Sequence, residues 1–134
     1  MARAKEKTLS LLSRTTLTLD SVAGTELSMY TTSTGKKAIP IEVVLHSFSE
    51  AIDLAVVTFG KTGGTCDEFL GDQTLTNVGA GFADEVLVCK PLQAATPLAQ
   101  LLLDAAEVFA AEITTAEATA ATCVADVWGY EFDA

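Results

Sequence analysis

The chain has 134 residues, 49% of them hydrophobic and 19% charged, a balance that argues against disorder and fits one folded domain. Its formal net charge is −10: residues 1–14 carry four basic residues and one acidic residue, a net +3, so that −13 falls on residues 15–134. Residues 15–134 are therefore acidic enough to repel a phosphate backbone, which argues against direct nucleic-acid binding. No apolar run approaches the ~20 residues that span a bilayer, and no secretory signal is expected.

Residues 8–19 predict the first strand. Threonine and leucine dominate the segment, and in an extended chain alternate side chains, beginning at Leu9, share one face. The polar middle, residues 13–16, would make poor helix interior, which also favours a strand. A turn at residues 20–24 leads to a second predicted strand at residues 26–32.

Residues 37–60 predict two strands and the connection between them, and we expect the rest of the chain to pack around this pair. Between residues 41 and 46, the odd positions carry Ile, Val and Leu and point to one face of an extended chain. Pro40 has no N–H to donate, so it suits the start of this strand. Apolar side chains alternate again over residues 55–59, and a glycine follows.

Residues 61–81 hold five of the nine glycines and predict an irregular segment. Within it, residues 67–70 are compatible with one helical turn, and residues 75–78 with a short strand. Residues 84–90 predict a clearer short strand, which Pro91 closes.

Residues 94–122 are ambiguous between helix and strand. A proline at the first helical position followed by alanine and leucine favours a helix over residues 97–106. Clustered β-branched residues favour a strand instead at residues 107–114. The last strand is predicted at residues 119–132, where Gly129 permits a bulge or a close approach of another strand.

The pattern gives about eight short strands without regular βαβ alternation. It therefore predicts an all-β fold, an antiparallel β-sandwich or jelly roll, with one short helix near residues 97–106 as a possible addition. We expect residues 1–7 to be a flexible basic N-terminal arm and residues 8–134 to be a single β-sandwich domain.

Cysteine and acidic residues do not predict a metal site. The cysteines are an odd number at wide spacing, which fits neither a disulfide framework nor a zinc site, and we interpret them as small apolar residues. Asp67, Glu68 and Asp72 offer oxygen ligands but lack the spacing of an EF-hand loop, and we interpret them as a solvated acidic loop. The cysteines are Cys66, Cys89 and Cys123.

No catalytic or cofactor-binding residue is predicted. His46, Ser47 and Asp53 are residue types of a hydrolase triad, but no nucleophile elbow surrounds the serine. Residues 55–62 match a loose P-loop pattern, yet Val-Val-Thr-Phe lies where flexible backbone would have to wrap phosphates. We therefore expect no enzyme activity and no cofactor.

Two groups of residues are candidates for protein contacts. Trp128, Tyr130 and Phe132 share a face of the last strand, where they form part of the core, a ligand shelf or a subunit interface. The basic arm would suit docking onto an acidic surface, including a second copy of the chain, or would be a frayed terminus. Its candidate contact residues are Arg3, Lys5 and Lys7.

Several short stretches resemble small virion structural proteins of tailed bacteriophages. They are a threonine-rich opening, Thr-Gly-Lys-Lys-Ala-Ile-Pro-Ile at residues 34–41, Thr-Phe-Gly at residues 58–60, and Asp-Val-Trp-Gly-Tyr at residues 126–130. The resemblance extends over about two thirds of the chain. The alanine-rich residues 94–121 depart from it, because more glycine and β-branched residues would be expected there.

This resemblance implies a β-sandwich or jelly-roll protein on the capsid surface, made in the host cytoplasm and often acting as a decoration (cement) protein. Its partners would be the major capsid protein and copies of itself, and no catalytic residue is carried over. Two alternatives stay open: a structural protein of the neck or tail, and a β-sandwich that binds a small ligand or carbohydrate. The second would use Trp128, Tyr130 and the glycine-rich residues 61–81.

Overall fold

The computed structural model describes residues 8–76, 85–91 and 100–134. These residues form eight strands and no helix. The strands are β1 (Ser10–Thr18), β2 (Glu26–Thr31), β3 (Lys36–His46), β4 (Val56–Lys61), β5 (Leu70–Thr74), β6 (Leu87–Cys89), β7 (Val108–Thr115) and β8 (Thr122–Asp133).

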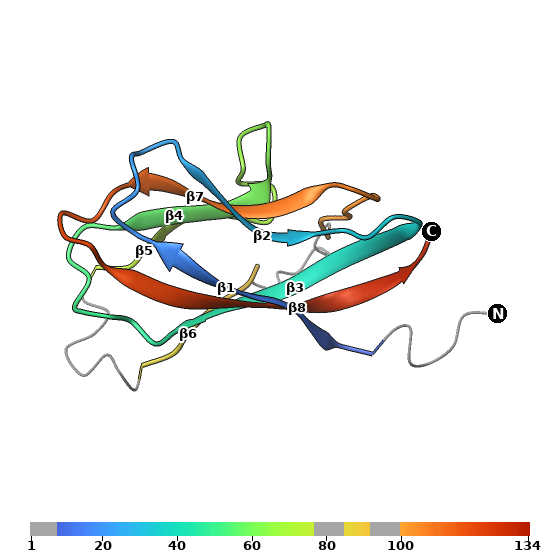
Figure 1. The fold of residues 1–134 in the computed structure, drawn as a ribbon, viewed down its shortest axis with the longest axis horizontal. Helices are drawn as coiled ribbons and strands as arrows, with labels where there is room; N and C mark the ends of the chain where they lie inside the picture. The colour runs from blue at the N-terminus through green and yellow to red at the C-terminus, as the bar shows by residue number, and fades with distance from the viewer. Residues whose placement is uncertain (1–7, 77–84, 92–99) are drawn as a thin grey trace.

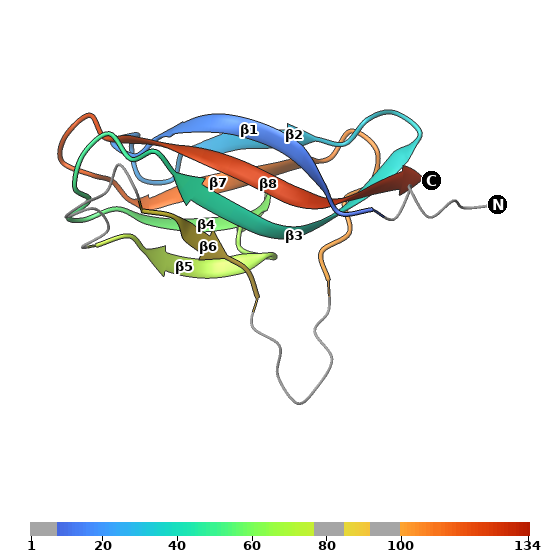
Figure 2. The same cartoon turned by 90° about the horizontal axis from the view of Figure 1, so that it is seen from below.

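The strands form two four-stranded sheets packed face to face (Figure 1). The first sheet has the order β1-β8-β3-β6, and the second has the order β2-β7-β4-β5. Figure 2 looks onto the first sheet, with the second behind it. Every neighbouring pair is antiparallel.

The pairing is that of one long hairpin rolled into a sandwich. β1 pairs with β8, β2 with β7, β3 with β6 and β4 with β5, while β3 also pairs with β8 and β4 with β7. This order defines an eight-stranded jelly roll, so the all-β fold expected from the alternating sequence pattern is confirmed.

The core lies between the sheets and is made by alternate residues of each strand. In β8, for example, Cys123, Ala125 and Val127 are fully buried, whereas the residues between them point outward. Each large apolar side chain in this layer stabilises the fold by roughly 1.5–3 kcal/mol. The largest fully buried ones are Phe59, Phe109, Leu17, Leu19, Leu45, Ile52, Leu75, Leu103 and Ile113.

The helix predicted at residues 97–106 is wrong for residues 100–106, and residues 97–99 lie outside the described part of the chain. Leu103 forms an isolated antiparallel bridge with Ala38 of β3, in which the two residues exchange backbone hydrogen bonds of 2.8 and 2.9 Å. The side chain of Leu103 is fully buried in the core. Burial and pairing with β3 therefore outweigh the local helix propensity.

Two smaller predictions in the glycine-rich segment are also wrong. The helical turn expected at residues 67–70 is irregular, because Phe69 is buried in the core and Leu70 already pairs with Phe59 of β4. The short strand expected at residues 75–78 comes earlier, as β5. Residues 77 and 78 lie outside the described chain.

Pro40 lies within β3 rather than at its start, and a bulge accommodates it. The register with β8 shifts between Pro40 and Glu42, so Ile41 is the extra residue. Gly129 of β8 lies opposite this bulge, and a Cβ on it would stand 2.3 Å from the carbonyl oxygen of Ile39 and 3.0 Å from the side chain of Leu12. The close approach expected at Gly129 is therefore confirmed.

Residues 62–69 fold back over the outer face of the second sheet. A Cβ on Gly60 would stand 2.7 Å from the backbone of Cys66 and of Asp67, so only glycine leaves room for this loop. The hydroxyl of Thr58 donates to the carbonyl of Cys66 at 2.7 Å. Residues 56–61, within the loose P-loop pattern, thus form β4, and a turn follows.

Glu117, between β7 and β8, ties its loop to the connection between β3 and β4. Its carboxylate is 5% exposed and accepts backbone N–H groups from Asp53, Leu54 and Ala55 at 3.2, 2.9 and 3.1 Å. Its own N–H donates to the carbonyl of Leu19 at 2.8 Å. Glu117 therefore joins three connections at this end of the sandwich, one bond set through its carboxylate and one bond through its backbone N–H.

Candidate interaction surface

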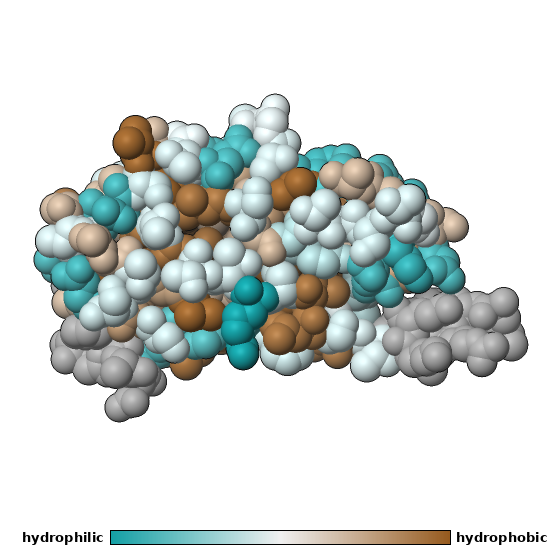
Figure 3. All heavy atoms as spheres, in the orientation of Figure 1, coloured by the Kyte–Doolittle hydropathy of each residue, from teal (hydrophilic) through white to brown (hydrophobic). Residues whose placement is uncertain are grey.

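The outer face of the first sheet combines aromatic, aliphatic and charged side chains. The register aligns Arg14, Asp126, Val44 and Val88 in one row across all four strands. A neighbouring row places Trp128 between Leu11 and Glu42, and a further pair sets Tyr130 opposite Ile39. Figure 3 views the sandwich edge-on, at right angles to Figure 2, and has apolar patches at the level of β1 and β8 in Figure 1.

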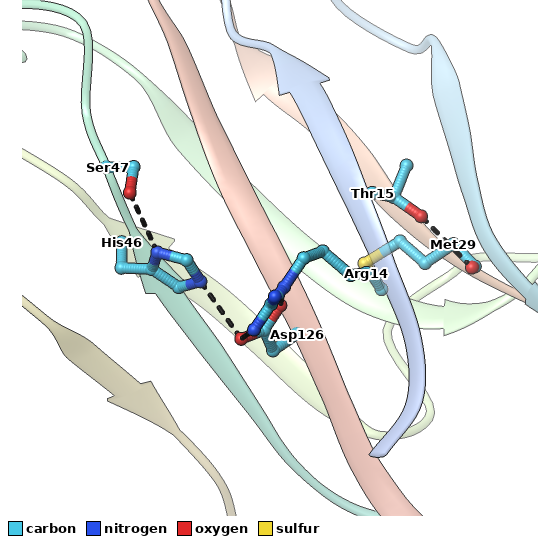
Figure 4. Close-up of polar contacts among 6 residues, drawn as sticks. All are labelled: Arg14, Thr15, Met29, His46, Ser47 and Asp126. Atoms are coloured by element: carbon cyan, nitrogen blue, oxygen red, sulfur yellow. Dashed lines mark hydrogen bonds and ion pairs between the residues drawn. The ribbon is translucent and has the colours of Figure 1, made fainter.

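Asp126 is the centre of a charged network on this face (Figure 4). Arg14 donates to both of its carboxylate oxygens, through Nε at 2.7 Å and Nη2 at 2.9 Å. Nε2 of His46 lies 2.9 Å from the second oxygen, and Nδ1 of His46 lies 2.9 Å from Oγ of Ser47. The side chain of Asp126 is 7% exposed, so its charge is almost covered, while that of Arg14 is 60% exposed.

Ser47, His46 and Asp126 are the three residue types of a hydrolase triad, but the acid is not the Asp53 considered from the sequence. Asp53 donates its N–H to Glu117 instead. Ser47 has a positive φ of 54°, which places its exposed hydroxyl beside His46. Because Arg14 neutralises the carboxylate that would orient and charge the histidine, we interpret this chain of hydrogen bonds as structural.

The carboxylates of Asp126 and Glu117 should make the stability of the folded chain depend on pH in the acidic range. Hydrogen bonds from Arg14 hold the pKa of Asp126 below its ordinary value, against the opposing effect of burial. Burial is the largest single influence on Glu117 and raises its pKa, but the backbone N–H donors together lower it. Such carboxylates stabilise the folded chain above their ordinary pKa, and this contribution is lost as the pH falls through the lower folded pKa.

We therefore expect urea midpoints to fall as the pH is lowered below about 4.5. Asp126→Asn should be less stable than the parent chain at pH 6, and should lose less stability between pH 6 and pH 3. Equal acid sensitivity in both chains, measured by urea melts at each pH, would contradict the assignment to Asp126.

The sequence-predicted contact residues of β8 lie on the outer face. Trp128, Tyr130 and Phe132 are half-buried and take no part in the core, in contrast to the core-packing alternative. Arg3, Lys5 and Lys7 lie outside the described residues. Sequence reasoning did not find the pairing of Arg14 with Asp126, because the two residues are adjacent only through the β1–β8 register.

The described part of the glycine-rich segment lies away from Trp128 and Tyr130, with which it was expected to form a ligand site. Trp128 and Tyr130 face outward from the first sheet, whereas residues 61–76 belong to the second sheet and to the loop over its outer face. The two parts therefore lie on opposite sides of the sandwich, and residues 77–81 lie outside the described chain. Residues 61–76 therefore form no carbohydrate or small-ligand site with Trp128 and Tyr130, and the alternative stays a prediction for the rest of the segment.

The cysteines are all buried and free, as expected for small apolar residues. Burial raises the pKa of Cys89 to about 11 and, with Cys89 nearby, that of Cys123 to about 12. Burial raises the pKa of Cys66 to about 12, and the negative charges of Glu26, Glu112 and Glu68 act in the same direction. Within residues 8–76, 85–91 and 100–134, no group of His, Cys, Asp and Glu is arranged to hold a metal ion.

The two outer faces differ in charge. On the first sheet, Arg14 pairs with Asp126 and Lys37 pairs with Asp104, while Glu42 adds one acidic residue. On the second sheet, Glu26 and Glu112 stand directly opposite each other, and the covering loop adds Asp67 and Glu68. These residues give the second face more negative charge than the first.

Comparisons with solved structures agree with the jelly-roll class. The chain is similar in fold to a chain in an "acidic stable capsid structure" of Helicobacter pylori bacteriophage KHP30, with a TM-score of 0.57 and 13% identity, covering 96% of this chain and 99% of the other. It is also similar to a chain in the capsid of Ralstonia phage GP4, with a TM-score of 0.55 and 14% identity, covering 92% of this chain and 84% of the other.

The resemblance to phage virion structural proteins is thus confirmed at the level of the fold. No protein-family model and no curated protein matches the sequence. Among the described residues there is no helix long and apolar enough to cross a membrane.

Proposed function

We propose that this chain is a structural protein of a bacteriophage virion, and in particular a decoration (cement) protein that braces the capsid from its surface. The observation that carries the proposal is a shared jelly roll that covers nearly the full length of both this chain and a chain of a phage capsid structure. Its partners would be the major capsid protein and further copies of itself, and synthesis would take place in the host cytoplasm.

The geometry suits such a role. A two-sheet body with a close-packed core, and with one end tied together by Glu117, is stiff. A modest interface that is repeated around a closed shell gains binding strength through multivalency. The role requires no catalysis. The described residues contribute surfaces, and the paired Arg14 and Asp126 stiffen one of them.

Purified virions test this proposal. We expect purified virions to contain this chain in a fixed ratio to the major capsid protein. Electron microscopy should locate it on the shell. A few copies per particle would favour the alternative placement at the neck or tail. Absence from purified virions would contradict a virion role altogether.

The N-terminal arm supplies a separate prediction. Deletion of residues 1–7 should leave the urea midpoint unchanged, because β1 begins at Ser10, and should weaken particle binding by removing the charges of Arg3, Lys5 and Lys7. A chain in which these three residues are replaced by glutamine is the matched control for length. Full particle binding by both variants would rule out a role for the arm.

A further inference from the structure

We propose that the outer face of the first sheet is the surface that docks onto the virion shell, and that its partner is a largely apolar protein surface supplying a carboxylate to Arg14. This inference rests on the proposed function and adds to it the docking face and the chemistry of the partner. Three properties of the face carry it: an oriented guanidinium group, apolar surroundings and a smaller negative charge than that of the opposite face.

The guanidinium group of Arg14 has N–H donors left for a second acceptor. Two of its five N–H donors are used by Asp126, and the side chain remains 60% exposed. The bidentate pair fixes the orientation of the guanidinium plane, so little side-chain freedom is lost when another carboxylate binds the remaining donors. A planar, oriented guanidinium favours a carboxylate over a neutral acceptor.

The surroundings of Arg14 are those of an interface centre. Trp128 and Tyr130 belong to the types most often found at binding hot spots, as does arginine itself. The rim is apolar: Leu11 is 40% exposed and Val88 is 54% exposed, although both belong to strands whose inward side chains are buried. Covering them would remove apolar area from water and strengthen the charge pairing at the centre.

Charge selects the partner. A second copy carries the same net charge of −10, so two copies repel each other as whole bodies. A shell surface that offers an acidic side chain to the free N–H donors of Arg14 does not bring this second body of net charge −10. In that orientation the anionic second sheet, with Glu26 and Glu112, points away from the shell.

The experiment measures binding to capsid shells from which this chain has been removed. Val88→Glu adds a charge at an exposed position of the face, and we expect it to weaken binding at least about 10-fold. Val22→Glu makes the same change at a 78%-exposed valine in the β1–β2 turn, off this face, and should bind within about twofold of the parent chain. Urea melts establish that both variants are folded.

A second variant tests the chemistry of the partner. Arg14→Lys keeps the charge but loses the planar fork, and should weaken shell binding about 10-fold in chains that urea melts show to be folded. Parent-like binding by this variant would overturn the carboxylate assignment, and parent-like binding by Val88→Glu would overturn the docking face. Dissociation of a soluble oligomer by Val88→Glu would overturn the shell as occupant in favour of a second copy. Failure of the parent chain to bind shells would instead refute the proposed function.

Discussion

Replacement of Glu117 by alanine should lower the free energy of unfolding by about 3 kcal/mol, because it leaves three backbone N–H groups, that of Ala55 buried, without their acceptor. The carboxylate accepts from Asp53, Leu54 and Ala55, and Glu117 itself is 5% exposed. For a domain of this size the thermal midpoint should fall by roughly 10 °C. Urea and thermal melts measure both quantities.

Two further variants separate the carboxylate from its neighbourhood. Glu117→Gln keeps one acceptor oxygen but turns an NH2 group toward N–H donors, so it should lose about half as much stability. Asp53→Asn removes an exposed charge from the same loop and keeps the backbone bond, so it should stay within about 0.5 kcal/mol of the parent chain. A loss in Asp53→Asn equal to that in Glu117→Ala would show that loop charge, not acceptor geometry, is responsible.

Gly129→Ala should be comparably damaging, with a loss of about 3 kcal/mol, because the added methyl group cannot be relieved by a side-chain rotation. Its Cβ would lie 2.3 Å from the carbonyl oxygen of Ile39 and 3.0 Å from Cα of Pro40, both in backbone paired with β8. Relief would require β3 and β8 to separate at the centre of the first sheet. The urea midpoint should fall with little change in slope.

Gly71→Ala is the matched control for this change. Gly71 lies in the edge strand β5, and an added Cβ would meet no atom within 4 Å. The variant should be neutral or more stable by up to about 1 kcal/mol, since alanine restricts the unfolded chain. If both glycine variants are destabilised equally, the steric explanation for Gly129 is wrong.

The alternation of apolar and polar residues was sufficient to predict the fold class. It located seven of the eight strands approximately, β5 being the exception, because in a two-layer sandwich each strand has one buried face, and period-two patterning follows directly from that. β8 is the clearest instance: the expected alternation and the role of Gly129 are both observed. The division into an N-terminal arm and one domain stays a prediction.

The errors arose where tertiary contacts override local preference. The residues around Leu103 in the sequence favour a helix, but Leu103 forms a bridge to Ala38. The local sequence contains no signal for this long-range pairing. Bulges in β1 and β3 changed which residues face inward, so Leu11 is exposed although the alternation grouped it with the buried Leu17.

The candidate surface was only partly predictable for the same reason. The aromatic side chains of β8 share a face by spacing alone, so they could be named from the sequence. The network around Asp126 joins residues that are 112 and 80 positions apart, and only the sheet register brings them together. Glu117 gave no signal beyond its acidic type, because its partners are backbone N–H groups.

The rolled-hairpin pairing has a consequence for biosynthesis. Among the described residues, β1 is an edge strand that pairs with β8 alone, so β1 must wait for the later synthesis of residues 122–133 before it can pair. Folding must then close very long loops, which places such topologies at the slow end of single-domain folding, on the order of milliseconds to seconds. Until β8 has been synthesised, the apolar strands β1 and β3 lack the strand with which both of them pair. Nascent chains translated from the same mRNA are then at risk of pairing with each other.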